Sequence, residues 1–528
     1  MIFRPREWIA AEPRLRALGL AAPVLLLVAV FLFAGLRGVD FGDQWDEMEW
    51  HIQPVREMVA GGVLLPRSYI YPSLSKWLEL LPALPSAAVA GLNTGGDPHS
   101  IQAAMKEAVN GPDYLLTVRR LFIVVSALAI IWTYAAVLAL RRPWWEAFIA
   151  AACLGLTWEY SYHARWVAND CILTQFAALT LFALAMFHRR PRGVWLTVGA
   201  IAVGLGTGTK FPGVLLLVPV IGMGLTTRPL RPLAAPIERV FALCAIAFAA
   251  YLVTTPGTVL DPFKFLEDGR RISTAYQQGH FGYSVASAWQ HWGVVLSYFA
   301  TAYFSPFLLV SVLVFGAALA GAVFWIREDR RMAAVLVGFP LVFLIFFCGK
   351  YRVAIVRNYL FLTPFLGVLA ARGIAAGVKR LPHVRLRAAL AGILAIVAVV
   401  QAAWLIGAGE SIRHFDSKVD VKDAVAYVAD HPETRYRLSD RVRSMAAQQG
   451  VTLPANATDR ADEQAVVFFA RADGPGPRHW KTNDRWLTKA VFGPREINFN
   501  WYASWENRDR VLVMTVEKAR ATGVALAQ

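Results

Sequence analysis

The chain alternates long apolar runs with short polar segments. A helix that crosses the roughly 30 Å hydrocarbon core of a bilayer needs about 20 mostly apolar residues, and a window of that length finds about eleven candidate spans. We expect them near residues 18–36, 121–140, 145–160, 171–187, 194–208, 211–225, 241–253, 294–325, 332–347, 359–376 and 388–406. The pattern predicts a polytopic α-helical membrane protein.

Arginine clusters between the apolar runs predict how the spans are oriented. These clusters lie at residues 4–16, 141–142, 189–192, 228–231, 327–331 and 372–387. If the spans alternate in direction, all of them fall on one side, which the positive-inside rule identifies as the cytoplasm. No small-residue cleavage site follows the first span, so we expect it to be a retained anchor. The outer side then receives residues 38–118, 161–170, 255–290, 349–358 and the chain after about 407.

Composition excludes the other broad classes. Hydrophobic residues make up 56% of the 528 residues and charged residues only 17%, which is too apolar for a soluble protein. The formal net charge of +16 is spread over short clusters between spans, which indicates membrane topology rather than a nucleic-acid partner. The four cysteines lie in or beside apolar runs, without the spacing of a disulfide framework or a zinc site.

The chain changes character after about residue 409. This tail is charged, and it holds a helix-like stretch at 421–429 and β-like runs at 465–469 and 511–515. We therefore predict two domains, a transmembrane domain at 1–408, whose first outer loop covers about 38–118, and a soluble α/β domain at 409–528.

Acidic residues crowd the start of the first outer loop. Asp43, Asp46, Glu47 and Glu49 follow the first span closely. A carboxylate at this low-dielectric boundary can accept a proton, or it can bind a divalent cation together with other acids. Asp46 and Glu47, with Asp170 from a later loop, are candidate ligands for such a cation. A solvated loop with helix-capping acids also fits the pattern.

Two further outer segments carry candidate residues. In the first loop, Tyr71 and Lys76 belong to a half-apolar stretch that favours an interfacial helix over a span. In the second, Arg165 and Asp170 flank the start of an apolar helix, where ionisable side chains mark a functional site by default. An ion pair that only closes the turn is the alternative for these two residues.

Outer cations point to an anionic partner. Lys210 follows a glycine-rich run that lacks the spacing of a nucleotide-binding loop, yet a lysine there can face a lipid phosphate. Helix packing is the other explanation of these glycines. Arg352 and Arg357 are guanidinium groups suited to phosphate oxygens, although snorkelling to headgroups also fits. His280 is a further site candidate, but no histidine of its loop has metal-ligand spacing.

From about residue 18 to 376, these motifs together resemble the GT-C superfamily, specifically its protein O-mannosyltransferase and lipid A aminoarabinose transferase group. The matching features are Asp46-Glu47 after the first span, Tyr71-Pro72-Ser73-Leu74 in the place of the family's His-Pro-Pro-Leu, the Arg165–Asp170 turn, the glycine-rich run that ends at Lys210, and Arg357-Asn358-Tyr359 in the place of its Arg-Tyr motif. Because a tyrosine replaces the histidine, any metal or phosphate role of that histidine is lost or moved.

The resemblance implies a GT-C fold of about eleven transmembrane helices in a bacterial inner membrane, with the site and the soluble domain on the periplasmic or extracellular side. It implies inverting transfer of a sugar from a polyprenyl-phosphate donor to a glycan, lipid or protein acceptor, among membrane lipids and without a nucleotide cofactor. Asp46 or Glu47 would be the catalytic carboxylate, with Asp46 preferred, and Asp170 a second acid. Lys210, Arg352 and Arg357 would hold the donor phosphate.

A secondary transporter or lipid-linked-sugar flippase is the alternative function. Such proteins carry ionisable residues in the middle of their spans. The middles of the spans expected here are almost free of charge. The sequence therefore favours chemistry at the outer interface over passage through the bilayer.

Overall fold

The computed structural model describes residues 13–40, 45–226, 235–279, 283–413, 425–438, 442–443, 446–447, 451–458, 465–471 and 509–516. These residues fall into two compact units. The larger comprises 13–39 and 46–409, and the smaller includes the C-terminal strands.

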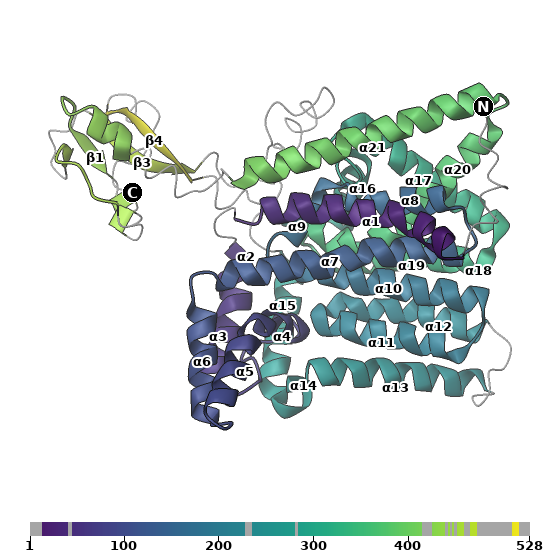
Figure 1. Cartoon of the computed structure of the whole chain (residues 1–528), viewed down its shortest axis with the longest axis horizontal. Helices are drawn as coiled ribbons and strands as arrows, with labels where there is room; N and C mark the ends of the chain where they lie inside the picture. Colours follow the sequence, from purple (N-terminus) through teal and green to yellow (C-terminus); the bar gives the residue numbers. More distant parts are fainter. Residues whose placement is uncertain are drawn as a thin grey trace. The chain divides into compact units, whose positions relative to one another are not determined.

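The larger unit is a bundle of long apolar helices (Figure 1). Within the described residues, eight helical segments are long and apolar enough to cross a membrane, which confirms a polytopic helical membrane protein. They are α1 (Pro13–Arg37), α7 (Tyr114–Ala139), α10 (Asn169–Arg189), α13 (Pro236–Thr254), α17 (Leu308–Glu328), the continuous run α18 (Arg330–Ala333), η5 (Ala334–Gly338) and α19 (Phe339–Lys350), the run η6 (Val356–Leu362) and α20 (Thr363–Arg380), and α21 (Val384–Arg413).

Three of the eleven expected spans are shorter helices. They are α8 (Trp144–Gly155), α11 (Gly193–Thr209), and η4 (Phe211–Leu216) with α12 (Leu217–Leu225). The span expected at 294–325 is wrong as a single helix, because it divides into α16 (Ala288–Thr301) and α17. Pro306 lies in the break, where it cannot donate a backbone hydrogen bond, and the Ser305 hydroxyl instead accepts the N–H of Phe307 at 3.0 Å.

Short helices gather at one end of the spans (Figure 1). They are α2 (Trp45–Glu47), the π-helical turn η2 (Met48–Ile52), α3 (Gln53–Ala60), α4 (Leu74–Leu80), η3 (Leu81–Ala83), α5 (Leu84–Asn93), α6 (Pro98–Asn110), α9 (Trp158–Ala164), α14 (Gly257–Leu260) and α15 (Pro262–Gln278). Ile52 and Val55 from this group pack with Val118 and Phe122 of α7 and Ile172 of α10. Burial of each such side chain contributes about 1.5–3 kcal/mol, which fixes the first loop on the bundle.

Glycines let α17 and α20 cross at close range. A Cβ on Gly321 would meet the carbonyl oxygen of Leu369 at 1.8 Å, and one on Gly373 would meet that of Ala317 at 1.9 Å. Helices in lipid gain no hydrophobic driving force from association, so the close van der Waals packing that small residues allow stabilises such a crossing. The crossing holds α20 and the site residues that precede it.

The smaller unit contains a four-stranded sheet within the described residues. The strands β1 (Tyr436–Leu438), β2 (Ala457–Thr458), β3 (Ala465–Arg471) and β4 (Asp509–Thr515) lie in the order β2-β1-β3-β4. β1 is parallel to both its neighbours, and β3 is antiparallel to β4 with Ala465 opposite Thr515. The two β-like runs are therefore confirmed. Residues 425–429 of the expected helix are helical, and its residues 421–424 lie outside the described residues. A separate soluble domain stays a prediction.

Candidate active site

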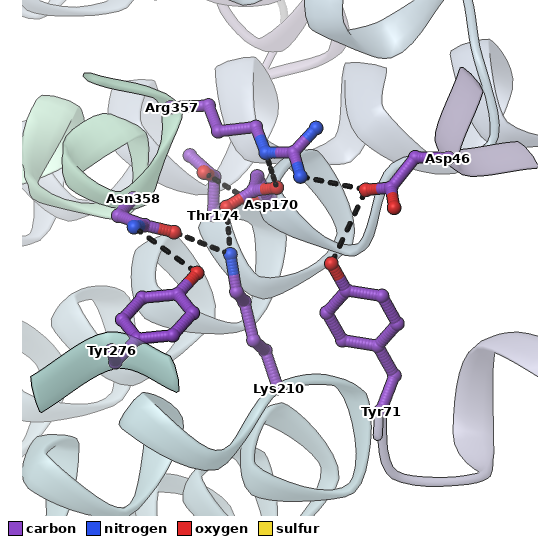
Figure 2. Close-up of polar contacts among 8 residues, drawn as sticks. All are labelled: Asp46, Tyr71, Asp170, Thr174, Lys210, Tyr276, Arg357 and Asn358. Atoms are coloured by element: carbon purple, nitrogen blue, oxygen red, sulfur yellow. Dashed lines mark hydrogen bonds and ion pairs between the residues drawn. The ribbon is translucent and has the colours of Figure 1, made fainter. Parts of the chain in front are cut away.

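Asp46 in α2 belongs to a buried group of charged side chains (Figure 2). Arg357 Nη2 donates to its Oδ2 at 2.6 Å, and the Tyr71 hydroxyl donates to the same oxygen at 3.2 Å. Desolvation and the Asp46 carboxylate raise the pKa of the Tyr71 hydroxyl well above its ordinary value. Tyr71 therefore remains a hydrogen-bond donor at neutral pH.

Asp170 provides the second carboxylate. It lies in the first turn of α10, where the helix dipole favours negative charge. Lys210 Nζ donates to its Oδ1 at 2.6 Å, and Arg357 Nε lies 3.6 Å from its Oδ2. Arg357 therefore bridges Asp46 and Asp170, as Figure 2 shows.

Lys210 is held at a chain reversal between α11 and η4. The reversal brings Gly213 so close to α11 that a Cβ there would lie 2.5 Å from the carbonyl carbon of Gly206. The glycines therefore serve close packing, and they aim Lys210 into the site. Its Nζ also donates to Asn358 Oδ1 at 2.7 Å, and Asn358 Nδ2 donates to the Tyr276 hydroxyl at 3.5 Å (Figure 2).

We call Asp46, Asp170, Lys210, Arg357 and Asn358 the ion cluster. Each is at most 6% exposed, and the five come from four separate segments of the chain. Two carboxylates balance two cations. Buried ion pairs rarely add net stability, because desolvation offsets much of the attraction. The burial of this cluster therefore supports the hypothesis that it is a functional site.

Glu47 does not join this cluster. Arg119 donates to both of its carboxylate oxygens, and the backbone N–H of Val167 donates to Oε1 at 2.8 Å. A carboxylate engaged this way has its lone pairs committed to fixed donors. The structure thus separates the two acids of the Asp46-Glu47 motif, and only Asp46 belongs to the ion cluster.

The structure gives the three expected metal ligands other partners. The guanidinium of Arg357 lies between Asp46 and Asp170, where a shared cation would have to sit, and Glu47 is paired with Arg119. Over the described ranges, no group of three or more Asp, Glu, His or Cys residues is arranged to hold a metal ion. The geometry instead supplies positive charge from side chains.

The structure places the remaining candidates outside the ion cluster. Arg165 is fully buried, donates to the carbonyl of Ala34 at 3.1 Å and lies over the ring of Trp158, so it does not close the turn by pairing with Asp170. Arg352 donates to the carbonyl oxygens of its own loop, at Gly349 and Tyr351.

Lys76 is fully buried within the first outer loop. It belongs to α4, and its ammonium donates to the carbonyl of Tyr71 at 2.9 Å. This hydrogen bond holds the backbone of Tyr71 in place. Asp43 and His280 lie outside the described residues.

The sequence alone did not identify three residues of this region. Asn358 joins the ion cluster through Lys210, Tyr276 contacts Asn358 from outside the cluster, and Arg119 pairs with Glu47. Arg119 offered a signal, because it is an arginine within the first turns of a span. Tyr276 offered none, since its α15 gave no pattern that connects it with residue 358.

An aromatic and a neutral histidine lie beside the cluster. The guanidinium of Arg357 stacks over the Trp166 ring, 4.9 Å from its centroid. The ring of His163 is 5.8 Å from that of Trp166. Burial, with Arg357 and Lys210 nearby, holds the pKa of His163 well below its usual value, so its imidazole adds no charge.

Several comparisons relate the chain to known proteins. It is similar to ArnT from Cupriavidus metallidurans bound to undecaprenyl phosphate, with 15% sequence identity and a TM-score of 0.44, over 97% of this chain and 99% of that chain. ArnT from the same organism in the apo state gives 14% identity and a TM-score of 0.43, over 96% and 98%. The Archaeoglobus fulgidus oligosaccharyltransferase in the apo form gives 13% and 0.41, over 88% and 68%. No curated protein matches the chain.

A family match covers the middle of the transmembrane unit. Residues 113–257 match the model of the family described as dolichyl-phosphate-mannose-protein mannosyltransferase. The matched segment contains Asp170 and Lys210, together with Arg119. Over this segment the chain is similar to that mannosyltransferase family, and the resemblance to a mannosyltransferase group that the motifs indicated is confirmed there.

Proposed function

We propose that the chain is an inverting glycosyltransferase that moves a sugar from a polyprenyl-phosphate carrier to a glycan, lipid or protein acceptor. The observation that carries this proposal is the buried bridge of Asp46 and Asp170 by Arg357, with Lys210 on Asp170. The matched family is named for a donor of this class, a sugar on dolichyl phosphate.

The cations suit a phosphate leaving group. When the bond between the anomeric carbon and the phosphate oxygen breaks, its electron pair passes to the polyprenyl phosphate. Lys210 and Arg357 stabilise the charge that develops there, and their burial strengthens this interaction. We propose that these two side chains supply the charge that a divalent cation supplies elsewhere.

Asp46 is suited to act as the base. As the acceptor oxygen attacks the anomeric carbon, the acceptor hydroxyl gives its proton to the Asp46 carboxylate. Attack from the face opposite to the leaving phosphate inverts the anomeric carbon in one displacement. Tyr71 and Arg357 fix the carboxylate for this step.

The site is proposed to face the periplasm or extracellular space from a bacterial inner membrane. It lies near the start of α10, whereas the basic Arg189–Arg192 segment follows the end of that helix. The positive-inside rule assigns the basic end to the cytoplasm. The C-terminal unit would then also lie outside.

Transfer from defined donors tests the proposal. Purified protein in detergent is incubated with a panel of radiolabelled polyprenyl-phosphate sugars and with candidate acceptors, with and without EDTA. We expect donor cleavage that persists in EDTA and is abolished in a folded Asp46→Asn variant. Wild-type turnover in Asp46→Asn would contradict the assigned base, and absence of donor binding and cleavage with every donor would contradict the function.

A further inference from the structure

A second buried ion pair lies next to the ion cluster without belonging to it. Glu47 and Arg119 are each at most 1% exposed. Arg119 Nε donates to Glu47 Oε1 at 2.9 Å, and its Nη2 donates to Oε2. This two-bond fork fixes the orientation of both side chains, not only their separation.

The pair ties together three segments of the chain. Arg119 belongs to α7, and its Nη1 also donates to the carbonyl of Val39, just beyond α1, at 3.0 Å. Glu47 lies in α2 and accepts the backbone N–H of Val167 at 2.8 Å. Each contact reaches a segment that is distant in the sequence.

Both carboxylates of the ion cluster are adjacent to these contacts. Asp46 immediately precedes Glu47, and Asp170 lies three residues after Val167. The Glu47 carboxylate therefore connects the segment that carries Asp46 with the segment that carries Asp170. The connection runs through one side chain that substrate need not touch.

The surroundings of the pair strengthen it. Val118, Phe122, Val167 and Ile172 form part of one buried apolar cluster around this region. In such a low-dielectric environment an ion pair is attracted more strongly than in water, and an unpaired partner is correspondingly costly. The Glu47–Arg119 pair therefore holds the segments it joins in a fixed arrangement.

We propose that the Glu47–Arg119 pair is a positioning device that sets Asp46 relative to Asp170 for sugar transfer. This inference rests on the proposed function. Glu47 acts through Asp46 and the residue 165–170 turn, not on the reacting atoms. Its loss is expected to lower the rate of the chemical step, because misplacement by about 1 Å can reduce a rate by about 10²-fold.

The test separates positioning from simple structural support. In Glu47→Gln the amide can still accept the Val167 N–H, but it presents an NH₂ group to the guanidinium and loses the fork. We expect kcat to fall by about 10²-fold with a change in donor KM below about threefold. Arg119→Lys keeps the charge but loses the fork. We expect its kcat to lie between those of the wild type and Glu47→Gln.

Glu328→Gln is the matched control, because it removes one carboxylate from a network of ion pairs far from the site along the spans. We expect its kcat to equal that of the wild type even where its Tm is lower. A Glu47→Gln variant with a lower Tm and unchanged kcat would show a purely structural role and overturn the inference. Loss of the acidic limb of the kcat pH profile would overturn it in favour of Glu47 as the base, because protonation of the base causes that limb.

Hydrogen exchange gives a readout that does not depend on transfer. The peptide that covers residues 165–170 is expected to exchange at least tenfold faster in Glu47→Gln, while peptides of the spans stay unchanged. Unchanged exchange in 165–170 would overturn the positioning role. Absence of sugar transfer in the wild type, with the faster exchange present, would contradict the proposed function instead.

Discussion

Two groups of ion pairs lie toward opposite ends of the spans, and they differ in burial. We call Arg142, Glu146, Glu328 and Arg372 the distal network. Glu328 accepts from Arg142 at 2.9 Å and from the fork of Arg372, yet its side chain is 33% exposed. The ion cluster makes equally short contacts with side chains at most 8% exposed.

The difference in burial decides what each group of ion pairs can do. The pairs that Glu328 makes join α17 to α20 and to Arg142, which follows α7, and water screens them because Glu328 is one-third exposed. Buried pairs gain strong local fields only by giving up hydration. A substrate that brings its own charge can use such fields, so the buried group is the one to which we assign the chemistry in the proposed function.

Arg357→Lys is expected to have the largest effect among the variants that test this contrast. Lysine keeps the charge but cannot reach Asp46 and Asp170 together, because it lacks the planar fork. We expect kcat/KM for the donor to fall by about 10²–10³-fold. Steady-state kinetics with a lipid-linked donor checks this, and a loss below about threefold would mean that the bridge is dispensable.

Lys76 tests the cost of burial directly. Burial lowers the pKa of its ammonium from 10.5 to about 8. Between these two values the unfolded chain binds more protons than the folded chain, so the free energy of unfolding should rise with pH through this window, by about 3 kcal/mol in total. Thermal unfolding of wild type and Lys76→Met across pH 7.5–10.5 isolates this contribution as a difference. Parallel pH dependences would contradict it.

Tyr71→Phe should have a smaller effect. It removes one hydrogen bond from a neutral donor to the Asp46 carboxylate and keeps the ring that stacks on His51. Loss of a hydrogen bond to a charged group is worth about 1.5–3 kcal/mol at most, and this 3.2 Å contact is long, so we expect a fall in kcat of about fivefold. An unchanged kcat would show that Arg357 alone orients the carboxylate.

Glu328→Gln should have the smallest effect on activity. Since the side chain is one-third exposed, we expect a loss of stability of at most about 1 kcal/mol and no change in kcat. Thermal unfolding and transfer rates measured on the same preparation check both points. A large fall in kcat would mean that the distal network is coupled to the site, and the contrast between the two ends would fail.

Particular residues show how far sequence patterns reached. Asp46, Asp170, Lys210 and Arg357 were each recognisable as charged residues beside an apolar run, and the structure brings all four together. Arg352 and Arg165 carried the same signal and lie elsewhere. Charge at a span boundary indicates that a residue needs a partner, but it does not identify the partner.

The pairing of Glu47 could not have been predicted. In the sequence it is equivalent to Asp46, since both acids follow the first span. A π-helical turn after α2 and the approach of Arg119 from α7 turn the two adjacent carboxylates toward different partners. Neighbouring residues on a helix point in different directions, so local spacing leaves the choice open.

The membrane class and most of the spans follow from the sequence, because a segment enters lipid when it is long and apolar enough, which is a property of its local composition. The orientation of the spans follows from the arginine clusters and stays a prediction. Only the tertiary structure decided which charges meet. A hydrogen-bonded ion pair forms only when its two groups come within about 4 Å of each other, and the fold brings Asp46, Asp170, Lys210 and Arg357 that close from segments far apart in the chain.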